Sequence, residues 1–291
     1  MKKLLSCALA LLLVLLTPAS ANSAPTRSDG DGGSALAVDE GCPVTVSAEQ
    51  LTFDIGGEGG WNGLTAQVTA VYQMENPTDE SLPVQMTFYL EQYRTYGREG
   101  AEALDTEGFS ITADGEPVEF ACAKAEADAE DTDRFALTYT VDFPAGAARE
   151  VAVSYPSRGL GRSDWTSHWR HTFTYLLSPA RHWADFGTLD VAVTTPESSP
   201  YVIQSSLPLE EAGERRYTAH FDSLPNGELT FTLYPEPRIT LADRLSSYQF
   251  QAFMVMGLPL LLLFAGLPAA AAAVLLVWLS RRARRLSQTR S

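Results

Sequence analysis

The stretch Leu64-Thr65-Ala66-Gln67-Val68-Thr69-Ala70-Val71-Tyr72-Gln73-Met74-Glu75 alternates apolar and polar side chains with few exceptions. A period of two is typical of a β-strand, because successive side chains of a strand point to opposite faces of its sheet. The stretch therefore predicts a half-buried strand.

The same alternation recurs on both sides of this strand. Asn76-Pro77-Thr78-Asp79 predicts a turn, and the alternating residues 84–91 after it predict an antiparallel partner. Asp114-Gly115 is typical of a two-residue hairpin turn. Further alternating segments cover residues 135–143, 151–155, 173–177, 189–193, 201–205, 217–221 and 229–233. These segments predict roughly a dozen strands and an all-β class.

This pattern predicts an all-β ectodomain, built as one large or two tandem immunoglobulin-like antiparallel sandwiches. Since about 100 residues suffice for one such sandwich, the chain has room for two. The Gly- and Ser-containing loop Ser157–Ser163 is the expected internal boundary. Residues 42–157 are then the first sandwich, and residues 158–236 are a second one or the second half of the same one.

An apolar segment near the C-terminus predicts a transmembrane helix over residues 252–279. It contains 28 residues without a charge, and a helix of that length reaches roughly 40 Å, enough to cross a bilayer. Trp278 stands at the expected interface, and the basic residues after it indicate the cytoplasmic side: Arg281, Arg282, Arg284 and Arg285. We expect a single-pass protein of the plasma membrane with a juxtamembrane segment at 237–251, a basic cytoplasmic tail at 280–291 and everything before them outside.

The N-terminus supports the same topology. Lys2 and Lys3 precede an apolar run and a small-residue site at Ala19-Ser20-Ala21, so residues 1–21 are expected to be a cleaved signal peptide. Residues 22–41 lack any apolar period and are expected to be a flexible acidic leader. Asp29 and Asp31 stand among glycines as in part of a calcium loop, so weak calcium binding is kept as an alternative for this leader.

Charge and cysteine content restrict the partners and the fold. Between the signal peptide and the tail, 14 basic residues stand against 36 acidic ones. This negative field disfavours nucleic acid and anionic lipid headgroups as partners. Cys42 and Cys122 are the two cysteines of the mature chain, and in an exported domain they are expected to form a disulfide worth about 4 kcal/mol. Two separate buried thiols are the alternative.

Residues 165–187 are the most aromatic part of the chain. They include Trp165, Trp169, Tyr175 and Trp183, which are interpreted mainly as core, with a carbohydrate or peptide platform as the alternative. His168, His171 and His182 have metal-like spacing, but residues three apart on a strand face opposite ways, so no metal site is predicted. The sequence contains no nucleophile elbow, zinc-protease motif or nucleotide-binding glycine loop, so no catalytic residues and no cofactor are predicted.

The residues Tyr175, Leu177, Ser178, Pro179, Ala180, Trp183, Phe186, Gly187, Leu189 and Val191 follow a pattern that resembles a segment of bacterial exported or membrane-anchored β-rich proteins. The resemblance covers one strand-loop-strand unit. It implies a β-sandwich ectodomain with a signal peptide and a single C-terminal transmembrane helix, and it implies no active residues.

The sequence therefore favours a non-enzymatic cell-surface ectodomain that binds, scaffolds or serves as an accessory subunit of an envelope system, with a protein partner in the envelope. An exported membrane-anchored hydrolase or a carbohydrate-binding protein is the alternative.

The uncharged run and the arginines behind it generate the first prediction. Protease added to intact cells should digest the ectodomain and spare a tag at the C-terminus, because the basic end of the helix stays inside. Immunoblotting for the tag measures this, with a cytoplasmic protein as the control for cell integrity. Loss of the tag from intact cells would contradict the orientation.

Overall fold

The computed structural model describes residues 30–38, 41–93, 102–126 and 132–288. The chain divides into a β unit, Pro25–Ser163 with His168–Thr240, and a smaller unit that includes Asp164–Ser167 and Leu241–Ser291. The predicted signal peptide lies outside the described residues.

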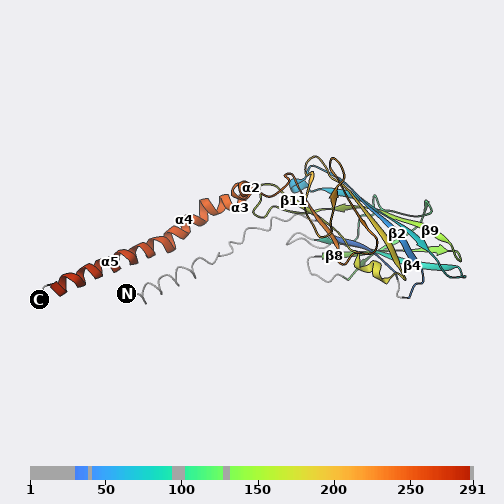
Figure 1. The fold of residues 1–291 in the computed structure, drawn as a ribbon, viewed down its shortest axis with the longest axis horizontal. Helices are drawn as coiled ribbons and strands as arrows, with labels where there is room; N and C mark the ends of the chain where they lie inside the picture. Colours follow the sequence, from blue (N-terminus) through green and yellow to red (C-terminus); the bar gives the residue numbers. More distant parts are fainter. Residues whose placement is uncertain (1–29, 39–40, 94–101, 127–131, 289–291) are drawn as a thin grey trace. The chain divides into compact units, whose positions relative to one another are not determined.

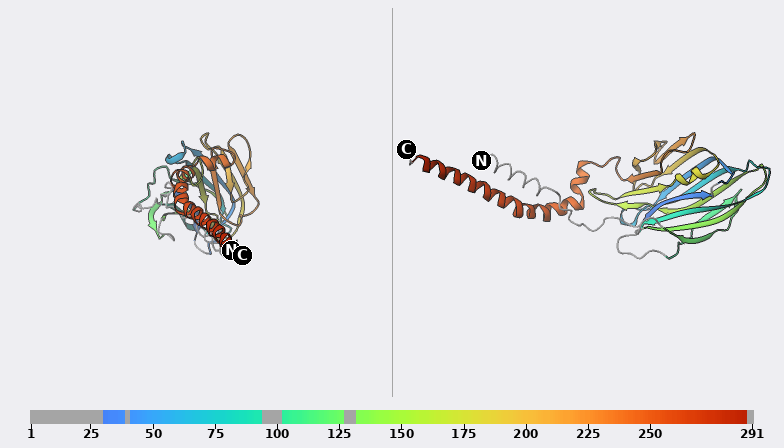
Figure 2. Two further views of the ribbon diagram at one scale, coloured as in Figure 1. Left: turned by 90° about the vertical axis from the view of Figure 1, so that its left-hand side faces the viewer. Right: turned by 90° about the horizontal axis from the view of Figure 1, so that it is seen from below.

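An eight-stranded sheet is the largest element of the β unit (Figures 1 and 2). Its order is β14 (Glu210–Glu211), β15 (Arg216–Phe221), β12 (Phe186–Thr194), β2 (Thr45–Gly56), β3 (Thr65–Glu75), β9 (Ala148–Arg158), β5 (Ser110–Ala113) and β6 (Glu116–Pro117). The alternating stretch of the sequence is β3, and its apolar positions Ala66, Val68, Ala70, Tyr72 and Met74 are all buried. The predicted strand is confirmed.

Two four-stranded sheets complete the described part of this unit. One has the order β1 (Gly30–Val38), β4 (Leu82–Tyr93), β8 (Thr132–Phe143) and β7 (Ala121–Ala125). The other has the order β10 (Leu160–Arg162), β11 (Arg170–Tyr175), β16 (Leu229–Tyr234) and β13 (Tyr201–Ser205). Two short 3-10 turns, η1 (Gly60–Asn62) and η2 (Ser178–His182), lie between strands.

Aromatic contacts join each small sheet to the large one. The ring of Phe53 on β2 lies 5.1 Å from that of Phe231 on β16, and the ring of Phe88 on β4 lies 4.7 Å from that of Tyr155 on β9. Side chains of all three sheets belong to one hydrophobic cluster. The predicted β class is therefore correct, whereas the sheets are open and the immunoglobulin-like type remains a prediction.

The pairing of β2 with β12 corrects the prediction of purely antiparallel sheets. These two strands run parallel, with Leu51 opposite Val191 and Phe53 opposite Val193. Residues from both sides of the boundary expected at 157 and 158 thus share one sheet. Period-two alternation reports which face is buried and says nothing of strand direction, so the sequence could not distinguish the two arrangements.

The acidic leader is also corrected in part. Gly30–Val38, expected to be flexible, forms β1 and pairs with β4 from Gly30 opposite Tyr93 to Val38 opposite Met86. The side chain of Leu36 is buried in the core. A glycine-rich segment has little strand propensity of its own, and the edge of β4 supplies its hydrogen bonds.

The predicted disulfide is not formed, because Cys42 and Cys122 are free thiols. Cys42 is half-buried against the core just before β2, whereas Cys122 is exposed on β7, an edge strand of a different sheet. The stabilisation expected from a disulfide is calculated from the sequence separation of the two cysteines alone. That separation carries no information on whether the two cysteines lie close together in the fold.

The smaller unit carries the apolar helix. Helical structure runs through α2 (Leu241–Ser246), α3 (Tyr248–Ala252), a π-helical segment Phe253–Gly257, α4 (Leu258–Leu261), a second π-helical segment Leu262–Gly266 and α5 (Leu267–Gln288). The helix continues through residues 280–288, predicted to be a tail, because Arg, Leu and Ala favour helix. Each π-helical segment contains the residue four before a proline, where a regular helical bond is lost: Val255 before Pro259 and Phe264 before Pro268.

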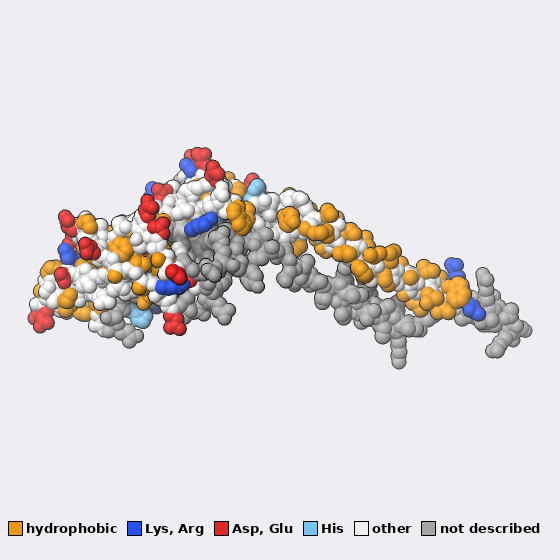
Figure 3. All heavy atoms as spheres, turned by 180° about the vertical axis from the view of Figure 1, so that it is seen from behind, with side chains coloured by type: hydrophobic (Ala, Val, Ile, Leu, Met, Phe, Trp, Pro, Cys, Tyr) orange, Lys and Arg blue, Asp and Glu red, His pale blue; other side chains and the backbone are white. Residues whose placement is uncertain are grey.

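Among the described residues, the helix Leu262–Arg282 has the length and composition needed to cross a membrane. Its mean hydropathy is 2.3, and none of the residues in its apolar stretch is buried against the rest of the protein. Hydrophobic side chains cover its length, and arginine side chains lie near its end (Figure 3). The guanidinium of Arg282 lies 5.3 Å from the ring of Trp278.

The closest backbone approach in the large sheet generates a stability prediction. A Cβ on Gly187 of β12 would lie 2.1 Å from the carbonyl oxygen of Ser47 on β2. Gly187→Ala should therefore lower the free energy of unfolding by about 3 kcal/mol, the upper range for overpacking. Gly56→Ala is the matched control, since nothing lies within 4 Å of its Cβ position. Urea unfolding of the full chain measures both, and equal midpoints would contradict the close approach.

Candidate functional site

The aromatic stretch of the sequence is divided between core and surface. Trp183 and Tyr175 are 5% and 2% exposed and belong to the hydrophobic cluster. Trp165 is 53% exposed, with φ 53°, and Trp169 is half-buried against Trp61. The stretch therefore does not form one platform.

The three histidines of this stretch take different environments. His171 is fully buried on β11, and burial, together with the Arg158 charge, lowers its pKa to about 4. The ring of His168 lies 5.9 Å from that of Tyr234, and His182 is exposed. No group of three or more metal-ligating side chains is present among the residues that the structure describes.

A cleft of about 590 Å³ lies on the large sheet, on the face opposite the core. Its floor consists of two cross-strand rows. Gln50, Asp190 and His220 form one row, and Thr52, Ala192, Thr218 and Glu210 form the other, with Arg216 and Pro208 beside them. The side chain of Ala192 is short at the centre of its row, while longer side chains surround it. The hollow follows from this difference in side-chain length.

Charge in the cleft centres on His220. Its Nδ1 lies 2.7 Å from Asp190 Oδ1, and its Nε2 lies 3.3 Å from Asp222 Oδ1. The hydrogen bond with Asp190, followed by that with Asp222, raises the pKa of the exposed His220 ring. Because both ring nitrogens face carboxylates, the arrangement favours a doubly protonated imidazolium over a general base with a free lone pair.

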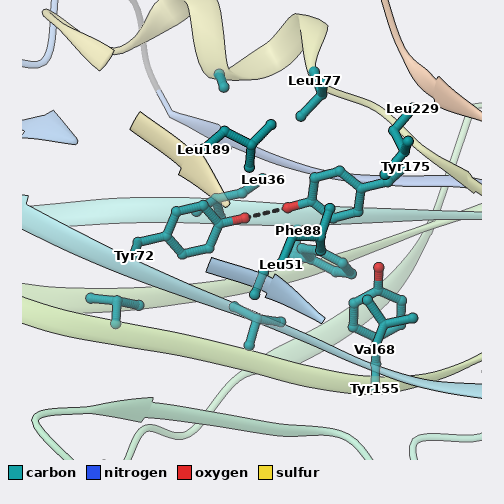
Figure 4. Close-up of a cluster of buried hydrophobic side chains, with 14 of the residues drawn as sticks. Leu36, Leu51, Val68, Tyr72, Phe88, Tyr155, Tyr175, Leu177, Leu189 and Leu229 are labelled. Carbon is teal, nitrogen blue, oxygen red and sulfur yellow. Dashed lines mark hydrogen bonds between the residues drawn. The ribbon is translucent and has the colours of Figure 1, made fainter. Parts of the chain in front are cut away.

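A second polar feature lies inside the core. Glu49 on β2 is 1% exposed, and its Oε1 accepts a hydrogen bond of 2.8 Å from the hydroxyl of Tyr175. The hydroxyl of Tyr175 lies 2.5 Å from that of Tyr72, which pairs opposite Glu49 on β3. Figure 4 shows the two tyrosines pointing at each other among apolar side chains that include Leu36 and Leu189. We call Glu49, Tyr72 and Tyr175 the buried polar cluster.

The ionisation of the buried polar cluster is controlled by burial. Loss of solvent raises the pKa of Glu49 to about 7, against the hydrogen bonds from Tyr175 and Tyr72, which lower it. Burial also raises the pKa of both tyrosines. The hydroxyl of Tyr139, on β8, is buried without a hydrogen-bond partner and its pKa is raised by burial. An uncharged Glu49 is therefore the main form in the folded protein below a pH of about 7.

Neither the cleft nor the buried polar cluster was predicted from the sequence. A signal for Glu49 was present, because the spacing of Glu49, Leu51, Phe53 and Ile55 puts the carboxylate on the buried face of β2. The cleft gives no such signal, since its residues come from four separate segments.

Comparison with known proteins identifies a fold and no family. No family model and no curated protein matches this chain. A Legionella pneumophila protein of known structure, provisionally assigned as a nutrient binding protein, is similar with a TM-score of 0.56 over 79% of this chain and 76% of that one, at 12% identity. At that identity the likeness is one of fold alone.

A second solved structure is less similar. Native yeast LTA4 hydrolase gives a TM-score of 0.34 and 9% identity, over 65% of this chain and 28% of the enzyme. A likeness at this level carries no argument about function.

The buried polar cluster generates a pH prediction. The pKa of Glu49 is about 7 in the folded state and 4.5 ordinarily. Its contribution to stability is thus complete below pH 4.5 and is lost as the pH rises through about 7, which amounts to roughly 3 kcal/mol. Urea midpoints measured across this window should fall for the wild type and fall less for Glu49→Gln, which keeps the size and removes the charge. Parallel pH profiles would contradict the assignment.

Proposed function

We propose that this protein is a non-enzymatic, membrane-anchored binding protein of the cell surface that captures a small polar solute in the cleft of its large sheet. The observation that supports this proposal is the cleft itself. Its volume of about 590 Å³ lies within the range of small-molecule sites, which is about 300–1,000 Å³.

The lining of the cleft supports a solute with charges of both signs. Glu210 offers a carboxylate and Arg216 a cationic donor, while Asp190 and His220 are paired with each other and add charge of both signs to the lining. Thr52, Thr218 and Gln50 add neutral hydrogen-bonding groups. Such a lining suits a zwitterion such as a free amino acid better than an apolar molecule, because each polar group of the solute finds an opposite partner.

Anchorage by the apolar helix completes the proposal. The length and composition of Leu262–Arg282 support one span, and the arginines after Trp278 favour a cytoplasmic C-terminus and an external β unit. The β unit itself is best described as a sandwich, because both small sheets contact the large one through Phe53–Phe231 and Phe88–Tyr155. An envelope partner that receives the solute belongs to the same proposal.

The engagement of His220 disfavours the hydrolase alternative. A hydrolytic histidine accepts a proton from a nucleophile or water through a free ring nitrogen. Both nitrogens of His220 lie within hydrogen-bonding distance of carboxylates, at 2.7 and 3.3 Å.

A blocked cleft tests the proposed function. Ala192→Trp should fill the hollow and weaken solute binding by about tenfold or more, at unchanged fold. Gln67→Trp, on the same exposed face but outside the cleft lining, is the matched control. Thermal unfolding of the full chain with panels of amino acids, sugars and polyamines measures binding.

We expect amino acids to raise the unfolding temperature of the wild type and of Gln67→Trp, and not that of Ala192→Trp. No effect of any solute on the wild type, or an equal effect on Ala192→Trp, would overturn the proposal.

A further inference from the structure

Two tryptophans meet at one end of the β unit on a surface that the cleft does not include. Trp61 lies on η1, between β2 and β3, and is 60% exposed. Trp169 lies directly before β11 and is half-buried. Their rings are 5.6 Å apart in an edge-to-face arrangement. Large aromatic side chains held at a surface mark an interaction site more often than solitary exposed ones do.

The loop that presents Trp61 is held in place by the backbone. Gly59, Gly60 and Gly63 have φ of 72°, 63° and 79°, a region that glycine enters at little cost. The amide of Gly63 donates to the carbonyl of Gly60, and the hydroxyl of Ser198 donates to the carbonyl of Gly57 at 3.0 Å. The exposure of Trp61 is thus built into the fold of the loop.

Arginines adjoin this aromatic pair. Arg158 at the end of β9 donates to the carbonyl of Asn62 at 3.2 Å. Arg162 and Arg170 stand opposite each other on β10 and β11, and Arg170 directly follows Trp169. Two exposed carboxylates, Glu58 on the Trp61 loop and Glu197 near Ser198, share the neighbourhood. In a chain whose net charge is −15, three arginines thus stand beside two tryptophans, with Asp164 two residues after Arg162.

This end is also the one from which the chain proceeds to the apolar helix. Tyr234, the last residue of β16, contacts the ring of His168, next to Trp169. Six residues, 235–240, connect Tyr234 to Leu241, the first residue of α2. Within the smaller unit, Ser167 of the β10–β11 loop donates to Asp243 of α2 at 2.5 Å.

We propose that Trp61, Trp169 and the arginines beside them form a surface that docks the β unit on the lipid headgroups of the membrane that anchors the chain. Indole rings partition to the membrane interface because one edge is apolar and the N–H is polar. The guanidinium groups of Arg158, Arg162 and Arg170 pair with lipid phosphates, which they can bind through two parallel hydrogen bonds. This inference rests on the proposed membrane anchorage.

Docking at this end has a consequence for the cleft. β3 leads from Thr65, near the docking surface, to Glu75 at the other end of the sheet, a length of roughly 35 Å. A β unit resting on its tryptophan-bearing end presents the sheet at a defined orientation to the bilayer, and the solute cleft with it.

Fluorescence quenching in lipid nanodiscs tests the docking surface on the full chain. Cys7, Cys42 and Cys122 are replaced by alanine, and one new thiol carries a polarity-sensitive dye. Asn62→Cys places the dye beside Trp61, and Asp79→Cys, an exposed position in the turn after β3, is the matched control at the other end of the sheet. The quencher is a nitroxide held high on the acyl chains of the lipid.

We expect the dye at position 62 to be quenched several-fold more than the dye at position 79. Adding phosphatidylglycerol to phosphatidylcholine should increase the quenching at position 62, and high salt or the change Arg158→Gln with Arg162→Gln should reduce it. Trp61→Ser should reduce the quenching while leaving the urea midpoint of unfolding unchanged, as for an exposed site.

Equal quenching at positions 62 and 79 would overturn the proposed docking surface. Quenching at position 62 that does not change with phosphatidylglycerol or salt would overturn the proposed role of the arginines. Failure of the anchorage itself gives a different result, because the chain would then not co-purify with the nanodiscs. Solute binding in the cleft is measured separately and is expected to persist in Trp61→Ser.

Discussion

The backbone pairing of β2 with both β3 and β12 is the constraint on which the rest of the structure depends. β3 follows β2 in the chain, but β12 is more than 100 residues away and joins in parallel, at a contact where Gly187 leaves no room for a side chain against Ser47. Through this pairing β2 contributes Glu49 and Phe53 to the core and Gln50 and Thr52 to the cleft. Both the core and the candidate site thus depend on one strand.

A carboxyl group in the centre of such a core costs stability unless it is neutral or hydrogen-bonded. The buried polar cluster meets this need with the Tyr175 hydroxyl, while the raised pKa of Glu49 keeps the group largely protonated at acidic pH. We interpret the cluster as a feature that fixes the register of β2 against β3. Glu49 and Tyr72 are paired across these two strands, so a slip by one residue would move one of the two side chains to the exposed face and leave the other without its partner.

The two proposed functions, solute capture and membrane docking, use different surfaces of the β unit. The face opposite the core carries the cleft of Asp190, Ala192 and His220, and the end near η1 carries Trp61 and Trp169. Solute capture and membrane docking therefore use different residues, and a variant at one site leaves the other intact. Similarity to a Legionella pneumophila protein at 12% identity supports the fold that connects them and nothing finer.

The sequence by itself determined the local features: the strands, through the alternation seen in β3 and its neighbours, and the apolar helix, through 28 uncharged residues. These follow from periodicity and length, which are local properties. Only the tertiary structure decided the parallel β2–β12 pair, the β1 strand on the edge of β4, the separation of Cys42 from Cys122 and the assembly of the cleft. Each of these depends on contacts between residues far apart in the chain, and neither strand direction nor proximity is encoded in the alternation of side chains.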